Sequence, residues 1–281
     1  MNFNEISSEK IYNRAKMLSF YLNDPIDKPI ERILDNIRMR YFYFNDELYL
    51  QINDSQILNG CLLSGAAELI YKEQKIDLNK FDFFFLSPND NLIVKPKLND
   101  KLECKICLFE YNLEKNFKIN APFEVQHFSL DKFIPRGEFG SKEKMCTYRT
   151  VWTAIKNGYF MSGFTNIPNE SLKQGVITSV NLEKNSEGKT EVYPHVHPEF
   201  PEIYIMCIDD DKYAISQYMI NLEGESVCRD LKDGEGLFFP GSLGHCNFAR
   251  PFYKNLKYCM YMWIIPTFGR TDTVLPITLK V

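Results

Sequence analysis

Three histidines and one glutamate from two distant segments constrain the fold of this chain more than any other feature. His195 and His197 stand two residues apart, Glu202 follows them closely, and His245 lies much further along the chain. They include three of the four histidines in the sequence. Three imidazoles and one carboxylate form a complete ligand set for a divalent transition metal. Only a fold that brings both segments together can make one site of them, and a β-barrel does so.

The local patterns around these residues are typical of strands. Residues two apart on a strand point to the same face, so one strand can present His195 and His197 to a barrel interior. Prolines after His197 indicate a short bend. Glu202 then opens the next strand, EIYIMCI, and His245 follows the turn FFPGSLG at the start of another.

Most of the chain beyond residue 40 reads as short strands. Segments rich in aromatic and β-branched residues alternate with Asn, Asp, Gly and Pro, which is typical of a sandwich or barrel. A hairpin is expected around Asn45-Asp46. Helical spacing of apolar residues predicts helices over residues 7–22 and 29–40, with Pro29 suited to a helix start.

Two stretches share one rhythm of strands and turns. AAELIYKEQKIDLNKFDFFFLSPNDNLIV parallels ESVCRDLKDGEGLFFPGSLGHCNFA, and each leads an aromatic strand into a turn that contains proline. We interpret this as an internal duplication of one barrel unit. The predicted organisation is a helical segment over 1–40, a metal-free barrel over 41–120, a linker over 121–144 and a metal-binding barrel over 145–281.

Composition limits the classes of binding partner and the cellular compartment that are expected for the protein. The formal net charge is −4, and no basic stripe suited to nucleic acid is visible. There is no apolar run of membrane-spanning length and no secretory signal, so a cytoplasmic protein is expected. The eight cysteines are scattered and read as reduced, mostly buried thiols. Cys104 and Cys107 lie three apart on an expected strand, which points them to opposite faces and argues against a metal or redox role.

The segments HVHPEFPE and GEGLFFPGSLGH resemble the two sequence motifs of the cupin superfamily. The first motif's His, His and Glu are all present, and Gly234, Pro240 and His245 stand at the intervals of the second. The position that carries Asn in the second motif is Ala249, and Asn247 lies nearby. The resemblance implies an all-β chain with two cupin-like jelly-roll barrels, preceded here by short N-terminal helices.

Within this superfamily the chain resembles the 4-deoxy-L-threo-5-hexosulose-uronate ketol-isomerase family. The matching positions are His195, His197, Glu202 and Tyr204, the acidic run Asp209, Asp210 and Asp211, Pro240 with His245, the strand MYMWII, Arg149 with Thr150, and the segment around His127. The resemblance implies isomerisation of 5-keto-4-deoxyuronate to 3-deoxy-2,5-hexodiulosonate. It also implies a homo-oligomer that binds a small sugar acid and a divalent metal, zinc first, with manganese or iron as alternatives.

The residues suggest how such a reaction would proceed. A Lewis-acidic metal favours proton loss beside a carbonyl and formation of an enediolate. Glu199 is a candidate base or a solvated carboxylate, and Tyr204 either hydrogen bonds substrate or packs in the barrel. Arg149 either binds the substrate carboxylate or forms a surface ion pair. His127, outside the metal half, is expected to be structural.

Two other functions fit the same ligand set. One is a cupin oxygenase or decarboxylase that uses iron or manganese. The other is a noncatalytic cupin that binds sugar. Metal content separates the noncatalytic protein from the enzymes, and oxygen consumption separates an oxygenase from an isomerase.

Overall fold

The chain is all-β, as the sequence predicts, in a computed structural model that describes residues 19–20, 30–34, 36–97, 103–113, 119, 121–136, 149–184, 186–194, 201–220, 226–241 and 243–267. Within these ranges the helical elements are α2 (Asn169–Gln174) and the single turn η2 (Leu130–Lys132). No helix in the same ranges has the length and apolar character needed to cross a membrane. The chain divides into two compact units, one of residues 23–132 and 154–161 and one of residues 1–22, 133–153 and 162–281.

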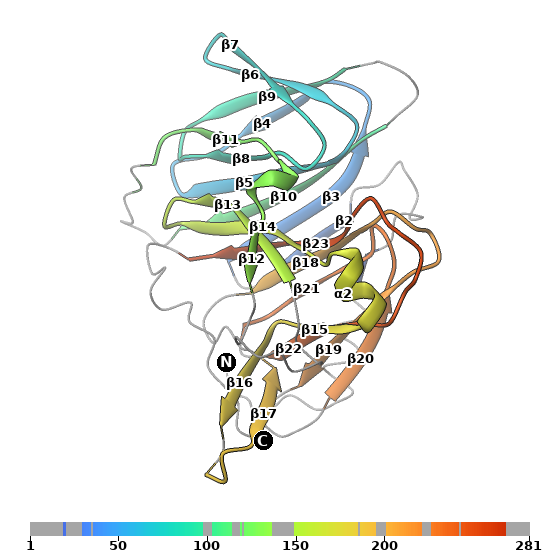
Figure 1. The fold of residues 1–281 in the computed structure, drawn as a ribbon. Helices are drawn as coiled ribbons and strands as arrows, with labels where there is room; N and C mark the ends of the chain where they lie inside the picture. The colour runs from blue at the N-terminus through green and yellow to red at the C-terminus, as the bar shows by residue number, and fades with distance from the viewer. Residues whose placement is uncertain are drawn as a thin grey trace. The chain divides into compact units, whose positions relative to one another are not determined.

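The first unit contains a barrel of two antiparallel sheets, which we call the first barrel (Figure 1). Its six-stranded sheet has the order β11 (Glu124–Gln126), β8 (Phe83–Leu86), β5 (Gln56–Ser64), β10 (Cys104–Asn112), β3 (Ile37–Phe44) and β2 (Ile30–Leu34). Its four-stranded sheet has the order β4 (Leu48–Gln51), β9 (Asn91–Pro96), β6 (Ala67–Tyr71) and β7 (Gln74–Leu78). Leu58, Phe84 and Leu108 from the larger sheet pack in one core with Leu69 and Val94 from the smaller.

The helix predicted over residues 29–40 is wrong, because this segment forms β2 and the first half of β3. Leu34 of β2 pairs with Ile37 of β3, and β3 then pairs along its whole length with β10. Ile37, Met39 and Tyr41 are buried at alternate positions. Pairing along β10 outweighs the local helical spacing, since strand preference depends mainly on packing against neighbouring strands. Of the helix predicted over 7–22, Ser19–Phe20 forms strand β1 and the rest lies outside the described residues.

The hairpin predicted at Asn45-Asp46 is also wrong. A turn is present there, but β3 belongs to the six-stranded sheet and β4 to the four-stranded sheet. The turn is therefore a corner that carries the chain from one sheet of the first barrel to the other. Cys104 and Cys107 lie on β10 and are buried thiols, as expected for a strand inside a barrel.

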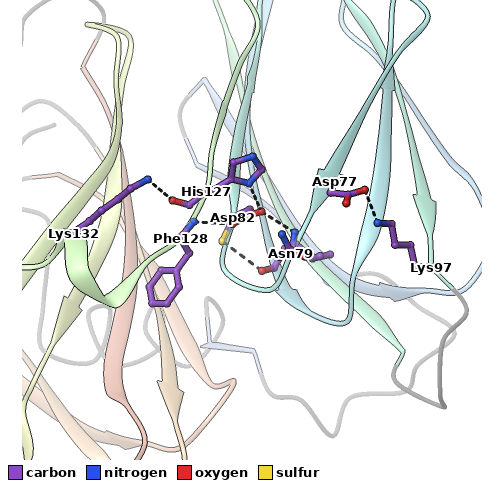
Figure 2. A network of polar contacts seen from close by, with 9 residues as sticks. Asp77, Asn79, Asp82, Lys97, His127, Phe128 and Lys132 are labelled. Carbon is purple, nitrogen blue, oxygen red and sulfur yellow. Dashed lines mark hydrogen bonds and ion pairs between the residues drawn. The ribbon is translucent and has the colours of Figure 1, made fainter.

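His127 is held by a buried carboxylate in the first barrel (Figure 2). Its Nδ1 lies 2.8 Å from Asp82 Oδ2, and Asp82 has 1% of its surface exposed. The same carboxylate accepts the backbone N–H groups of Asn79 at 2.8 Å and Phe128 at 2.7 Å. Lys132 Nζ donates to the His127 carbonyl oxygen at 2.8 Å. These contacts join the segment after β11 to the turn before β8.

The second unit contains the second barrel, which again has two main sheets. Its seven-stranded sheet has the order β1, β21 (Gly236–Phe239), β18 (Glu202–Ile208), β23 (Cys259–Pro266), β14 (Phe160–Asn166), β13 (Arg149–Lys156) and β12 (Ile134–Arg136). Its four-stranded sheet has the order β15 (Val176–Thr178), β22 (Gly244–Ala249), β19 (Ile215–Ile220) and β20 (Ser226–Leu231). A separate pair consists of β16 (Val180–Lys184) and β17 (Thr190–Pro194).

Strand order supports the predicted duplication. The first barrel contains the neighbours β8-β5-β10-β3, and the second contains β21-β18-β23-β14. The four-stranded sheets follow β4-β9-β6-β7 and β15-β22-β19-β20. In both barrels the strands of the two sheets therefore succeed one another along the chain in the same sequence. This correspondence lets individual positions of the two barrels be compared.

We predict that Gly60→Ala destabilises the first barrel by about 1–3 kcal/mol, the usual effect of overpacking a core. Gly60 lies on β5 opposite Phe84 of β8, and a Cβ there would overlap the buried Phe84 ring. Urea unfolding of wild-type and variant protein measures the change.

Phe84→Leu provides the matched background, because its smaller side chain removes the overlap. Gly60→Ala should then have a much smaller effect in Phe84→Leu than in the wild type. Equal effects in both backgrounds would contradict the packing explanation.

Candidate metal centre

Glu202 and His245 meet inside the second barrel although they belong to different sheets. Glu202 is the first residue of β18, and His245 is the second residue of β22. His245 Nε2 lies 3.1 Å from Glu202 Oε2. Both residues are buried, with 1% and 2% of their surfaces exposed. Two expected ligands from distant segments therefore lie in contact.

The face of β22 that carries His245 is established by its neighbours on the strand. Cys246 lies in a small apolar cluster with Val180, against which Phe248 packs. Alternate residues of a strand point to opposite faces. His245 and Asn247 therefore share the other face of β22, which is the face directed to Glu202.

One hydrogen bond determines the tautomer of His245. Its Nδ1 lies 3.0 Å from the carbonyl oxygen of Leu243. A carbonyl oxygen only accepts, so Nδ1 donates and carries the proton. Nε2 then faces a carboxylate oxygen of Glu202, and both atoms are of the kinds that ligate a divalent cation. A backbone carbonyl that orients an imidazole in this way is the common outer support of a metal-bound histidine, so the pair fits a divalent metal such as zinc, manganese or iron.

Three of the predicted site residues lie outside the described residues, namely His195, His197 and Glu199. They belong to the connection between Pro194, where β17 ends, and Glu202, where β18 begins. In the part of the chain that the structure describes, no group of three or more His, Cys, Asp or Glu side chains is arranged to hold a metal. The four-ligand centre therefore stays a prediction, of which Glu202 and His245 form the described half.

Aromatic rings enclose the imidazole. The ring centroid of Phe239 lies 4.8 Å from that of His245, and the ring of Tyr204 lies 5.6 Å away at a steep angle. Tyr204 is on the same face of β18 as Glu202 and has 2% of its surface exposed. The rings shield the Glu202–His245 contact from water, which strengthens electrostatic interactions within it.

Four buried hydroxyl groups continue from Tyr204 into the barrel. Ser179 Oγ lies 3.3 Å from the Tyr204 hydroxyl and 3.1 Å from the Tyr261 hydroxyl. The Tyr261 hydroxyl lies 2.9 Å from Thr178 Oγ1. Ser179 has a φ of 59°, a left-handed conformation that is uncommon for residues other than glycine. Tyr204 thus packs in the barrel and hydrogen bonds Ser179, and a hydrogen bond from its hydroxyl to substrate stays a prediction.

A row of polar side chains across the four-stranded sheet completes the interior. Thr178 of β15 pairs with Asn247 of β22, and Asn247 pairs with Gln217 of β19. All three have 1% or less of their surface exposed. Asn247 Nδ2 donates to Gln217 Oε1. From the sequence, Asn247 was noted only as lying near the motif position of Ala249, and Thr178, Ser179 and Gln217 were not identified. The one sequence signal of these residues is a polar side chain within an otherwise apolar strand.

The first barrel shows what these positions contain when no site is present. Ala67 and Ile215 begin β6 and β19, and they pair with the last residues of β9 and β22. This shared register aligns His245 with Leu92, Asn247 with Val94, and Gln217 with Leu69. Leu58 and Glu202 correspond because each pairs with the last residue of the neighbouring strand, β8 or β21.

The same comparison extends to the hydroxyl groups. Thr178 pairs with Asn247 as Leu48 pairs with Val94, so Thr178 corresponds to Leu48. By the same reasoning on β23 and β10, Tyr261 corresponds to Ile106. In the first barrel all of these positions carry apolar residues that contribute to one core. The fold itself therefore does not require polar residues there, and their presence in the second barrel needs a functional explanation.

Arg149 begins β13, where its backbone pairs with Arg136 of β12. In the seven-stranded sheet, β13 is the third strand from β18, which carries Glu202. Thr150 Oγ1 donates to the carbonyl oxygen of Asn166, the N–H of Ile167 donates to that of Cys259, and Cys259 pairs with Ile208. Arg149 therefore lies level with the Ile208 end of β18, whereas Glu202 is at the other end, roughly 20 Å along the strand. The structure does not bring Arg149 to Glu202, and its role stays a prediction.

The acidic run after β18 stabilises a turn. Asp209 Oδ2 accepts the backbone N–H of Lys257 at 3.2 Å. Asp210 accepts from Lys254 Nζ and from the backbone N–H groups of Lys212 and Tyr213, and these hydrogen bonds lower its pKa to about 2. Because the pKa is lowered, the stabilisation is present above the usual range of an aspartate and is lost as the pH falls toward 2. Asp209 and Asp210 therefore have a structural role in this turn.

Comparison with known proteins identifies the fold. No family model matches the chain, and no curated protein matches it. An IolB-like protein from Salmonella typhimurium matches with a TM-score of 0.60 and 10% identity, over 89% of this chain and 92% of that one. The putative glyoxylate induced protein of Pseudomonas aeruginosa gives 0.58 and 8%, over 94% and 88%. A variant of Bacillus subtilis oxalate decarboxylase gives 0.52 and 10%, over 93% and 79%. The neighbours have the cupin fold, and so does this chain with its two cupin-like barrels.

We predict that His245→Leu destabilises the metal-free protein by about 3–5 kcal/mol, because it leaves the carboxylate of Glu202 buried beside an apolar side chain. Adding Glu202→Leu should restore most of the loss, since the first barrel carries leucine at both corresponding positions. Unfolding by urea with a chelator present measures the free energies. A double variant that is less stable than His245→Leu would contradict this account of the pair.

Proposed function

We propose that the second barrel is a divalent metal site that isomerises 5-keto-4-deoxyuronate to 3-deoxy-2,5-hexodiulosonate. The observation that carries the proposal is the replacement of an apolar core by interacting polar residues around Glu202 and His245. The sequence resemblance at His195, His197 and Tyr204 supports the choice of reaction. A cupin fold is compatible with catalysis of this kind.

In this proposal, different residues bind the metal, bind the substrate and transfer the proton. Glu202 and His245, with His195 and His197, would hold the metal, which supplies Lewis acidity next to the substrate carbonyl when bound. Arg149 would bind the carboxylate of the sugar acid through its planar guanidinium. These roles are proposed from residue chemistry and from the sequence resemblance, and for Glu202 and His245 also from their contact in the second barrel.

Proton transfer needs a base close to the carbon that bears the hydroxyl group. Glu199 would accept that proton and return it to the neighbouring carbon, which interconverts aldose and ketose through an enediolate. The Tyr204 hydroxyl would hydrogen bond a substrate oxygen and keep the reacting carbons in one plane. The rings of Tyr204 and Phe239 next to His245 would exclude water from the reactive intermediate.

The first test is turnover of 5-keto-4-deoxyuronate in deuterated water by protein of measured metal content. An enediolate route places solvent deuterium in the product, which nuclear magnetic resonance detects. A panel of related uronates establishes the range of substrates, and an oxygen electrode runs in parallel.

Two results would reject the isomerase. Oxygen consumption or release of carbon dioxide without isomerisation would favour an oxygenase or decarboxylase, and one of the matched structures is an oxalate decarboxylase. Metal-free, fully folded protein that binds sugars without turnover would favour a noncatalytic cupin. A homo-oligomer is also proposed, and its subunit number is measured by light scattering.

A second prediction concerns Tyr204. Tyr204→Phe keeps the ring against His245 and removes the hydroxyl, so metal content should not change while kcat/KM falls by about 10- to 100-fold. Tyr253→Phe is the control, because Tyr253 is 77% exposed and should behave as wild type. Full activity of Tyr204→Phe would restrict Tyr204 to packing.

A further inference from the structure

Within the described part of the chain, the side-chain carbonyl oxygen of Asn247 is an unsatisfied hydrogen-bond acceptor inside the second barrel. Its Nδ2 donates to Gln217 Oε1, whereas its Oδ1 is buried and makes no hydrogen bond to any residue that the structure describes. Asn247 has 0% of its surface exposed. Leaving a buried polar atom unsatisfied is unfavourable, so native proteins rarely do so without a reason.

Asn247 also lies next to the candidate metal centre. It is two residues after His245 on β22, so both side chains project from the same face of the strand. Its cross-strand neighbour Thr178 is linked through Tyr261 and Ser179 to the Tyr204 hydroxyl. Polar side chains therefore lie on both sides of Asn247 inside the second barrel, His245 along β22 and Thr178 across the sheet.

The first barrel argues against a purely structural role. Val94 occupies the position of Asn247, and Leu69 occupies that of Gln217, in a closed apolar core. The duplicated barrel is thus built without either amide. Two adjacent buried amides, with one acceptor left over, are explained by a ligand that supplies the missing partner.

We propose that Asn247 is a specificity-determining residue that binds a hydroxyl group of a polyhydroxylated ligand in the second barrel. A hydroxyl both donates and accepts, so it satisfies the amide in either orientation. The inference rests on the proposed function in taking the ligand to be a sugar acid. A site that hydrogen bonds a hydroxyl rejects the analogue that lacks it, because the protein group is then left without a partner.

The test is a thermodynamic cycle in which the Asn247 side chain and one ligand hydroxyl are removed separately and together. Calorimetry measures binding of glucuronate, its monodeoxy analogues and neutral hexitols to wild type and to Asn247→Val, which carries the residue of the first barrel. We expect one deoxy position to lower the affinity of the wild type by about tenfold to a hundredfold, and to leave that of the variant unchanged. Asn247→Ala, which also removes the amide and needs no room for a new side chain, serves if Asn247→Val does not fold.

The outcomes separate this inference from the proposed function. Coupling between Asn247 and one hydroxyl supports the inference even if no uronate is isomerised. If the protein isomerises a uronate but every deoxy analogue loses the same affinity for wild type and variant, the inference is overturned. The proposed function is then unaffected. Failure of every hexuronate and hexitol to bind also overturns it, and an ordered water is then the partner of Asn247.

Discussion

The two sheets of each barrel pack face to face, and the side chains between them must fill the gap at native density. Packed sheets stand about 10 Å apart, so every inward position faces another side chain and not water. The first barrel meets this constraint with Leu58, Leu92 and Val94. The second places polar groups at the corresponding positions, and each must then find a partner inside the barrel. The arrangement of the candidate site follows from that requirement.

A buried carboxylate next to an imidazole is an unfavourable choice if stability is the only criterion. Desolvation of such a pair offsets its attraction, and apolar replacements are often as stable or more so. This chain contains both solutions in equivalent barrels, with Leu58 and Leu92 in one and Glu202 and His245 in the other. The comparison shows that the fold forms without the polar pair, which supports the proposal that the pair binds a metal.

Much of the architecture could be predicted from local patterns. Alternating apolar residues indicated the strands, and the spacing of Glu202 and His245 indicated that distant strands converge. The predictions that failed depended on distant pairing partners. Residues 30–40 have helical spacing, yet β3 is a strand because β10 lies beside it. The turn at Asn45-Asp46 is a corner between sheets, since β4 pairs with β9 and not with β3. The residues around each segment do not indicate that β10 pairs with β3 or that β9 pairs with β4.

Asn247 illustrates a limit of another kind. On a strand taken alone, a polar residue at an alternate position indicates the solvent face. Here β22 carries polar residues toward the interior and apolar Phe248 toward the other face, where β16 contributes Val180. The direction of a strand is thus assigned by what covers each face. Once the register of the two barrels is known, the presence of Asn247 where the first barrel has Val94 shows that the polar face of β22 is directed into the barrel.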